Sequence, residues 1–344
     1  MPQPVLGAAG RTDTDSTVFG VDIDAAGTIV GTVANGPFGP APGGLLMAGT
    51  RTAGTALTPD RSRAIAATAA GGAQASLQAP KGIDVVAELG VAFVADFRRN
   101  NQFPTGRIEA YRYGTEGDVA AAFEIDLPDT RPWDLDYDIE EDRLYVALTN
   151  GSLLIFDDVL SNPPADDSAA RVVQPAVDGV ALEGNLHGIN HHRVYDADGG
   201  VLFDELILSD VGLANDGTDG RVYVLSAPDM GDAAFAGLQD VDLNIDGLSE
   251  ADGQITSCNV DGINGNDAAV LGNPVDLAYS AIEDSVYVVD KSTQALVHIR
   301  LERSALNGRA DDFVASCAAL GFAPEALQLL PNNLPPFKPD LPLD

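Results

Sequence analysis

Short hydrophobic runs separated by polar turns recur along the chain, and they are clearest between residues 273 and 300. Three such runs follow one another there, at residues 275–279, 286–290 and 296–299. Runs of β-branched and aromatic residues bounded by Asp, Ser and Asn predict short strands joined as a meander. One meander cannot bury its own apolar face, so the pattern predicts neighbours of the same kind.

The same order of strands recurs upstream, at residues 80–111, 132–156 and 186–224, with weaker copies within residues 18–66. Equivalent positions in the clear copies are Gly82, Asp134, Gly188 and Asp276. The steps between them are 52, 54 and 88 residues, and the last step predicts a hidden unit between two steps of 44. A repeat of about 40–50 residues is typical of propeller blades with roughly four strands each. We therefore predict an all-β propeller, with seven blades favoured over six.

The repeat reads P-x-D-L-x-Y, then a Y-V-x-D strand, then G-x-L-x-x-I. It resembles the β-propellers of the YVTN, NHL and lactonase-like type, over residues 80–225 and 273–302. The resemblance implies a closed ring of blades, whereas a β-sandwich or an open solenoid of similar meanders is the alternative. Those families include enzymes, sensors and binding scaffolds, so the resemblance leaves the activity open.

The regions outside the clear repeats differ in composition. Residues 1–17 are polar and are expected to be a loose lead-in to a propeller of residues 18–308. Residues 228–272 are expected to be an acidic insertion in that propeller. Residues 309–344 are expected to form a C-terminal segment, helical in two short pieces and then proline-rich and extended.

Acidic residues outnumber basic ones by 52 to 19, and the formal net charge is −33. A chain of this charge repels phosphate backbones and anionic lipids, which disfavours nucleic acid and membrane surfaces as partners. The acid excess, with only three lysines, fits a halophilic-type surface hydrated in a salty medium, where screening reduces self-repulsion. Binding of divalent cations is the alternative reason for the excess.

The longest uncharged stretch, residues 25–50, is broken by Gly and Pro and does not predict a membrane span. The first residues, MPQP, look like a start placed after a removed leader, so we expect an extracellular or periplasmic protein. In that compartment Cys258 and Cys317 predict one disulfide, with two buried free thiols as the alternative. The expected partner is a protein or a glycan.

Residues 242–247 place Asp, Asn and Asp at alternate positions before a glycine. This resembles the first half of an EF-hand or dockerin calcium loop, although Gly253 stands where the bidentate Glu belongs. A second acidic turn follows within twenty residues, and the two turns together offer the six to eight oxygens that Ca²⁺ prefers. Solvated Asp, Asn and Gly turns are the alternative. The candidate calcium ligands are Asp242, Asn244, Asp246, Asp252, Asp261, Asn264 and Asp267.

Three of the four histidines lie close together, at His187, His191 and His192. On a strand, alternation sends His187 and His191 to one face and His192 to the other. Four residues of strand span ~13 Å at ~3.3 Å per residue, which is too far for His187 and His191 to share a metal. A zinc site is therefore not expected, and His187 is a hypothetical base or ligand acting singly.

The first strands of propeller blades line the central channel. The expected lining residues are Asp84, Asp134, Asp136, His187, Asn190 and Asp276. Carboxylates that converge on a low-dielectric channel bind a cation or have raised pKa values. The lactonase-like resemblance implies a metal there that polarises a carbonyl, but the Glu-Asn-Asn-Asp ligand set of gluconolactonase-type propellers cannot be placed on these motifs.

The sequence also lacks a G-x-S-x-G nucleophile elbow, a Walker loop and a paired-cysteine metal motif. The favoured function is therefore an exported, non-catalytic propeller that acts as a binding or structural module and is stabilised by Ca²⁺. The alternative is a metal-dependent lactonase or esterase with Asp134, Asp276 and His187 at the channel.

Overall fold

The computed structural model describes most of the repeats. The described residues are 3–8, 17–23, 29–34, 44–48, 77–97, 105–113, 119–177, 180–181, 184–213, 219–226, 239–241, 255–256, 271–303, 310–320 and 323–330.

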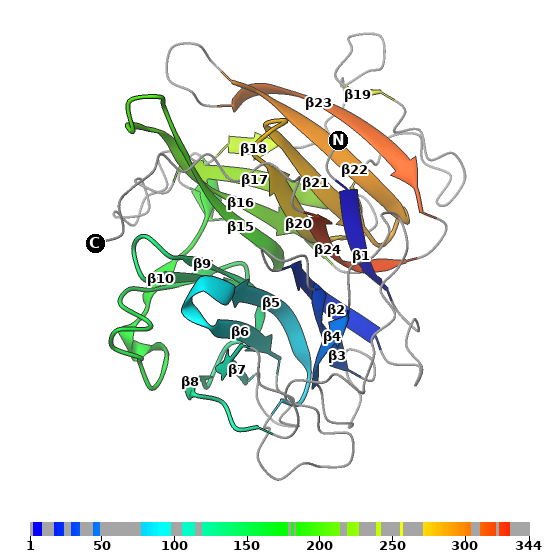
Figure 1. Cartoon of the computed structure of the whole chain (residues 1–344). Coiled ribbons are helices and arrows are strands. Elements are labelled where there is room, and N and C mark those ends of the chain that lie inside the picture. The colour runs from blue at the N-terminus through cyan, green and yellow to red at the C-terminus, as the bar shows by residue number, and fades with distance from the viewer. Residues whose placement is uncertain are drawn as a thin grey trace.

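These residues form antiparallel sheets arranged around a common centre (Figure 1). The first sheet contains β2 (Thr17–Ile23), β3 (Ile29–Ala34) and β4 (Gly44–Ala48). The second contains β5 (Pro80–Val86), β6 (Val91–Asp96), β7 (Gly106–Arg112) and β8 (Phe123–Leu127). The third contains β9 (Pro132–Asp138), β10 (Arg143–Leu148), β11 (Leu153–Phe156) and β12 (Arg171–Val173).

The second half of the chain continues the arrangement. One sheet contains β15 (Leu186–Tyr195), β16 (Val201–Asp210), β17 (Arg221–Ser226) and β18 (Gln239–Val241). The next contains β20 (Pro274–Ser280), β21 (Ser285–Asp290), β22 (Ala295–Arg303) and β23 (Ala310–Ala319), with β19 (Ile255–Thr256) parallel to β23. Finally, β1 (Gln3–Ala8) pairs with β24 (Pro324–Leu330). The remaining elements are the hairpin of β13 (Ala176–Val177) and β14 (Val180–Ala181) and the 3₁₀ turns η2 (Ala87–Leu89) and η3 (Asp167–Ala169).

The innermost strands of these sheets contact one another in a closed order within the described part of the chain. β2 contacts β5, β5 contacts β9, β9 contacts β15, β15 contacts β20, β20 contacts β24, and β24 contacts β2. Radial sheets whose first strands close a ring are the arrangement of a β-propeller. We call these six strands the inner strands.

The hydrophobic core lies between neighbouring sheets. Phe93 and Ile108 of the β5–β8 sheet, for example, pack with Leu144 and Val146 of the β9–β12 sheet in one buried cluster. Equivalent clusters fill the next two spaces around the ring. Each sheet therefore buries its apolar faces against its neighbours, as the repeat pattern predicts.

A buried aspartate at the end of the second strand explains part of the repeat. Asp96, Asp210 and Asp290 each accept hydrogen bonds from backbone N–H groups just before the first strand of their own sheet. Asp290, for example, accepts from Gly272 N at 2.7 Å and Asn273 N at 2.8 Å. The Asp of the Y-V-x-D pattern is thus a structural residue that fixes the loop leading into each sheet.

Two predictions about the ends of the chain were wrong. The residues expected to be C-terminal helices are strands β23 and β24, because pairing with β22 and β1 overrides the helix propensity of an Ala-rich segment. The segment expected as a loose lead-in contains β1, which pairs with β24 (Figure 1).

Among the described residues of the 88-residue step, the predicted hidden unit is not found. β15 contacts β20 directly, and residues of both sheets share one core cluster. Within the segment expected as an insertion, β18 completes the β15–β18 sheet and β19 adds to β23. Seven blades are therefore not confirmed.

Cys317 is disulfide-bonded. The other cysteine of the sequence, Cys258, lies outside the described residues, so its pairing with Cys317 stays a prediction. Among the helices that the structure describes, none has the length and apolar character needed to cross a membrane.

Candidate functional site

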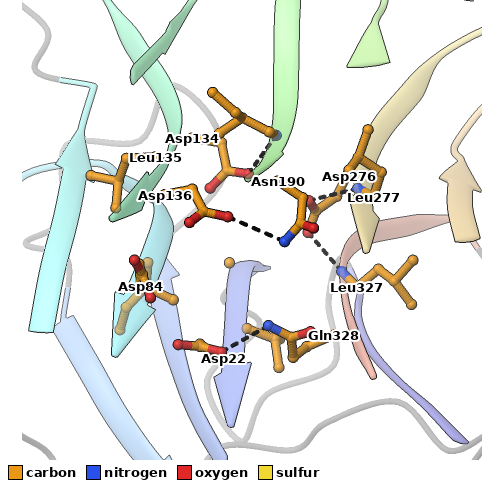
Figure 2. Close-up of a pocket in the computed structure, with 14 residues that line it drawn as sticks. Asp22, Asp84, Asp134, Leu135, Asp136, Asn190, Asp276, Leu277, Leu327 and Gln328 are labelled. Atoms are coloured by element: carbon orange, nitrogen blue, oxygen red, sulfur yellow. Dashed lines mark hydrogen bonds between the residues drawn. The ribbon is translucent and has the colours of Figure 1, made fainter. Parts of the chain in front are cut away.

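The inner strands surround a cavity of about 380 Å³, a volume that includes space open to solvent. Each inner strand contributes residues to its wall (Figure 2). The polar side chains in the wall are Asp22, Asp84, Asp134, Asp136, Asn190, Asp276 and Gln328. We call the five aspartates of this set the axial carboxylates.

Each axial carboxylate accepts a hydrogen bond from the backbone of the next inner strand around the ring. Asp22 of β2 accepts from Val85 N at 2.5 Å. Asp84 of β5 accepts from Tyr137 N of β9 at 2.7 Å.

The same relation continues around the ring. Asp134 of β9 accepts from Ile189 N of β15 at 3.1 Å. Asp276 of β20 accepts from Leu327 N of β24 at 2.7 Å. The carboxylates thus bind neighbouring sheets to one another.

Asp136 and Asp22 also accept hydrogen bonds from the amide side chains of Asn190 and Gln328, and Asp136 accepts a backbone hydrogen bond as well. Asp136 Oδ2 accepts from His191 N at 2.8 Å and from Asn190 Nδ2 at 3.1 Å. Gln328 Nε2 donates to Asp22 Oδ1 at 2.8 Å, which connects β24 with β2 (Figure 2). The two amide side chains therefore extend the same hydrogen-bonded ring.

Glycine stands where a neighbouring strand comes too close for a side chain. A Cβ atom on Gly82 would lie 1.9 Å from Asp134 Oδ1 and 2.6 Å from its Cα. A Cβ atom on Gly188 would lie 2.8 Å from Leu277 N and 3.0 Å from Asp276 Cα. The alternation of Gly and Asp at equivalent repeat positions is therefore a packing requirement of the ring.

Burial raises the pKa values of the axial carboxylates Asp84, Asp134, Asp136 and Asp276. The pKa of Asp136 rises to about 6 and that of Asp276 to about 7, in both cases chiefly through burial. The pKa values of Asp84 and Asp134 are also well above the ordinary range, first through burial and then through the neighbouring carboxylates Asp136 and Asp276 respectively. Hydrogen bonds from the backbone oppose these shifts, because they favour the charged form.

The grouping and the hydrogen bonds of the axial carboxylates decide whether they could hold a metal ion. In the described part of the chain, no three His, Cys, Asp or Glu side chains are grouped as a metal ion requires. The axial carboxylates point toward the cavity but direct oxygens at backbone N–H groups, as described above (Figure 2). They do not fit the channel metal that the lactonase resemblance implies. All seven candidate calcium ligands lie outside the described residues.

The three histidines have separate surroundings. The ring of His187 is buried and stacks on Trp133, with centroids 3.6 Å apart. His191 Nε2 lies 2.7 Å from Asp204 Oδ1. The ring of His192 stacks on Tyr279 of β20 with centroids 3.7 Å apart. His187 stacks on Trp133 of the preceding inner strand and His192 on the following one, so the histidines form no common site.

A second set of inner-strand residues lies just before the cavity-lining residues in each strand. Each inner strand has a register irregularity just before its cavity-lining residues. Such β-bulges re-aim the side chain at the bulged position. The residues at these positions are Phe19, Lys81, Trp133, His187, Val275 and Glu325, and we call them the bulge tier.

Five of the six expected lining residues are in the cavity wall, whereas His187 is in the bulge tier and does not line the cavity. Of the catalytic set in the alternative function, the fold brings Asp134 and Asp276 to the cavity without His187. Asp22 and Gln328 also line the cavity, but they were not predicted from the sequence as lining residues. The weak N-terminal repeat F-G-V-D signals Asp22, whereas Gln328 lies in the segment that was predicted to be helical.

Comparison with known proteins gave matches among solved structures alone. No protein-family model matches the chain, and no curated protein matches it. The chain is similar to hydrazine synthase of Kuenenia stuttgartiensis at 13% identity, with a TM-score of 0.51 over 90% of this chain and 76% of that chain.

Two further matches have lower TM-scores. One is the periplasmic gluconolactonase of Pseudomonas aeruginosa, at 14% identity and a TM-score of 0.48 over 93% of this chain and 75% of that chain. The other is a nidogen/laminin complex, at 12% identity and a TM-score of 0.48 over 92% of this chain and 86% of that chain. At such identities the likeness concerns the fold alone. The chain resembles β-propellers of the lactonase and YVTN type in its fold of sheets around a closed ring, as its repeat motifs predict.

Proposed function

We propose that the chain is a non-catalytic β-propeller of six blades that acts as a binding or structural module. The observation that carries this proposal is the use of the axial carboxylates. Asp84, Asp134 and Asp276 each hold a backbone N–H of the neighbouring inner strand. Carboxylates used in this way stabilise the ring, which is the requirement of a rigid scaffold. The closed order of the inner strands supports the count of six.

The proposed module is exported, binds a protein or a glycan, and is stabilised by Ca²⁺ in the 228–272 segment. The net charge of −33 supports a salty or calcium-rich medium. The alternate oxygen ligands from Asp242 to Asp246 support the calcium loop. Calcium should raise the melting temperature and protect residues 228–272 from proteolysis, and Asp246→Ala should reduce both effects. Equal protection by Ca²⁺ in the Asp246→Ala variant would contradict the assignment of that ligand.

The scaffold function is tested by assaying lactones of several ring sizes with Ca²⁺, Zn²⁺ or Mn²⁺ added. We expect no turnover above that of the metal in buffer. The matched variant is Asp134→Asn, which keeps a hydrogen-bond acceptor for Ile189 N and removes the charge. Metal-dependent turnover that this variant abolishes while remaining folded would overturn the proposal.

The second candidate, a lactonase or esterase, is favoured by the pKa values in the cavity. With pKa values of about 6 and about 7, Asp136 and Asp276 are suited to general acid–base catalysis near neutral pH. Loss of turnover in Asp276→Asn with a bell-shaped pH profile in the native protein would support this candidate over the scaffold.

A further inference from the structure

Lys81 of the bulge tier is a buried amine whose nitrogen has no hydrogen-bond partner in the part of the chain that the structure describes. Its side chain is 0% exposed, and its Nζ atom has no partner among the described residues. The Nζ atom lies 3.1 Å from the ring centroid of Phe19 and 4.7 Å from that of Trp133. Lysine is almost never fully buried unless it is paired. These aromatic faces surround Lys81 but offer no lone-pair acceptor.

The charged groups around Lys81 do not compensate for its burial. Burial lowers the pKa of Lys81 from 10.5 to about 7, against the opposing charges of Glu325 on β24 and Asp96 on β6. The positive charge of Lys291, whose Nζ atom lies 2.5 Å from Glu325 Oε1, lowers the pKa of Lys81 further. The cation–π contacts are worth about 2 kcal/mol when desolvated, which is less than the desolvation cost of an ammonium group.

Arg131 and His187 are further titratable residues near this cluster. The guanidinium of Arg131 lies 4.8 Å from the ring centroid of Phe97, whose other neighbours include Lys81 at 5.7 Å. The pKa of His187 is held well below its ordinary value by burial and then by Lys81 and Lys291. At neutral pH, His187 is therefore an uncharged ring stacked on Trp133.

We propose that Lys81 is an acid-responsive latch between the inner strands at the bulge tier. As a neutral amine it packs as an apolar side chain against Phe19 and Trp133 and so connects the inner strands β2, β5 and β9. As an ammonium group it leaves these aromatic faces for water or a carboxylate, and the contacts between these inner strands loosen.

The direction of the response follows from proton linkage. The pKa of Lys81 is lower in the folded chain than in the unfolded chain, so its contribution to stability is lost as pH falls through about 7. Asp136 and Asp276 have raised pKa values, so their contribution is lost as pH rises. Mild acid therefore loosens the bulge tier while it stabilises the axial carboxylates.

Trp133 is the one tryptophan of the chain, and it lies in contact with Lys81 and His187. Its fluorescence therefore reports the latch without a label. The experiment records Trp133 emission and its quenching by acrylamide between about pH 9 and about pH 5. We expect a red shift and increased quenching with a midpoint near the pKa of Lys81, about 7.

Two variants separate Lys81 from the neighbouring histidine. Lys81→Met keeps an unbranched side chain without the amine and should lose the transition. His187→Phe keeps an aromatic ring against Trp133 and should retain it. A transition that persists in Lys81→Met, or one that disappears only in His187→Phe, would overturn the proposal. So would a native protein whose Trp133 emission does not change over this range.

Discussion

The axial carboxylates and the bulge tier lie at neighbouring positions of the same inner strands, yet their buried charged groups have different surroundings. Asp84 accepts a backbone N–H from the next inner strand, as does Asp276. At the bulge tier, Lys81 Nζ has aromatic faces around it and no hydrogen-bond partner among the described residues. A regular inner strand presents its N–H groups to its neighbour, whereas a bulge turns its side chain out of that register. The comparison indicates that the carboxylates hold the ring together through hydrogen bonds, whereas the buried amine of Lys81 lacks that compensation among the described residues.

The largest effect is expected from filling the space that Asp134 occupies beside β5. Gly82→Ala would place a Cβ atom 1.9 Å from Asp134 Oδ1, so the two strands must separate. We expect a loss of about 3 kcal/mol in the free energy of unfolding, measured by urea denaturation. Gly90→Ala is the control, because φ is +67° there and no atom lies within 4 Å. It should cost about 1 kcal/mol from backbone strain alone, and equal losses in the two variants would contradict the close approach.

A somewhat smaller effect should follow from removing one axial carboxylate. Asp136→Ala leaves His191 N and Asn190 Nδ2 without their acceptor, and should cost about 2 kcal/mol in the free energy of unfolding. Asp136→Asn retains an acceptor oxygen and should cost less than half as much at about pH 7. If Asn is as destabilising as Ala, the negative charge and not the hydrogen bond is what the ring needs.

The pH dependence of the free energy of unfolding distinguishes the axial carboxylates from the bulge tier. The pKa of Asp276 is raised to about 7, so its stabilising contribution is present near pH 4 and is lost as pH rises through 7. Asp276→Asn should therefore gain about 2 kcal/mol relative to the native protein between about pH 5 and about pH 8. Chemical denaturation at both pH values measures the difference. A constant difference would show that Asp276 does not titrate in this range.

For Lys81 of the bulge tier, the contribution to the free energy of unfolding should change with pH in the opposite direction and by a smaller amount. Lys81→Met should raise the free energy of unfolding by about 1 kcal/mol at about pH 6, because it removes a buried ammonium group. At about pH 9 the amine is neutral in the folded chain and still protonated in the unfolded chain, so the advantage should be smaller than at pH 6. Lys291→Met is the control, since Lys291 is partly exposed and pairs with Glu325. A destabilised Lys81→Met variant at pH 6 would mean that the cation–π contacts outweigh burial.

The sequence predicted the repeat and much of the channel wall. Alternating apolar residues in 275–279 and its upstream copies placed Asp84, Asp134 and Asp276 on first strands, and these residues line the cavity. The prediction worked because the strand alternation and the repeat spacing are local signals. It did not show that each carboxylate accepts a hydrogen bond from the next sheet, since that contact joins residues about fifty positions apart.

Other features depend on tertiary contacts and could not be predicted in the same way. The Ala-rich segment from Ala310 to Ala319 has no strong strand pattern and becomes a strand because β22 offers an edge. Likewise, Gln328 reaches the channel because β24 pairs with β1, which is more than three hundred residues away. The β-bulges at Lys81 and His187 leave no mark in the alternation of polar and apolar residues.

The central claim is that axial carboxylates bind neighbouring inner strands through backbone N–H groups, and amide hydrogen exchange tests it most directly. In Asp84→Ala, the Tyr137 amide should exchange about tenfold faster relative to the Leu327 amide, which Asp276 holds. Asp84→Asn should restore most of the native ratio. An unchanged ratio of Tyr137 to Leu327 exchange in Asp84→Ala would contradict the claim.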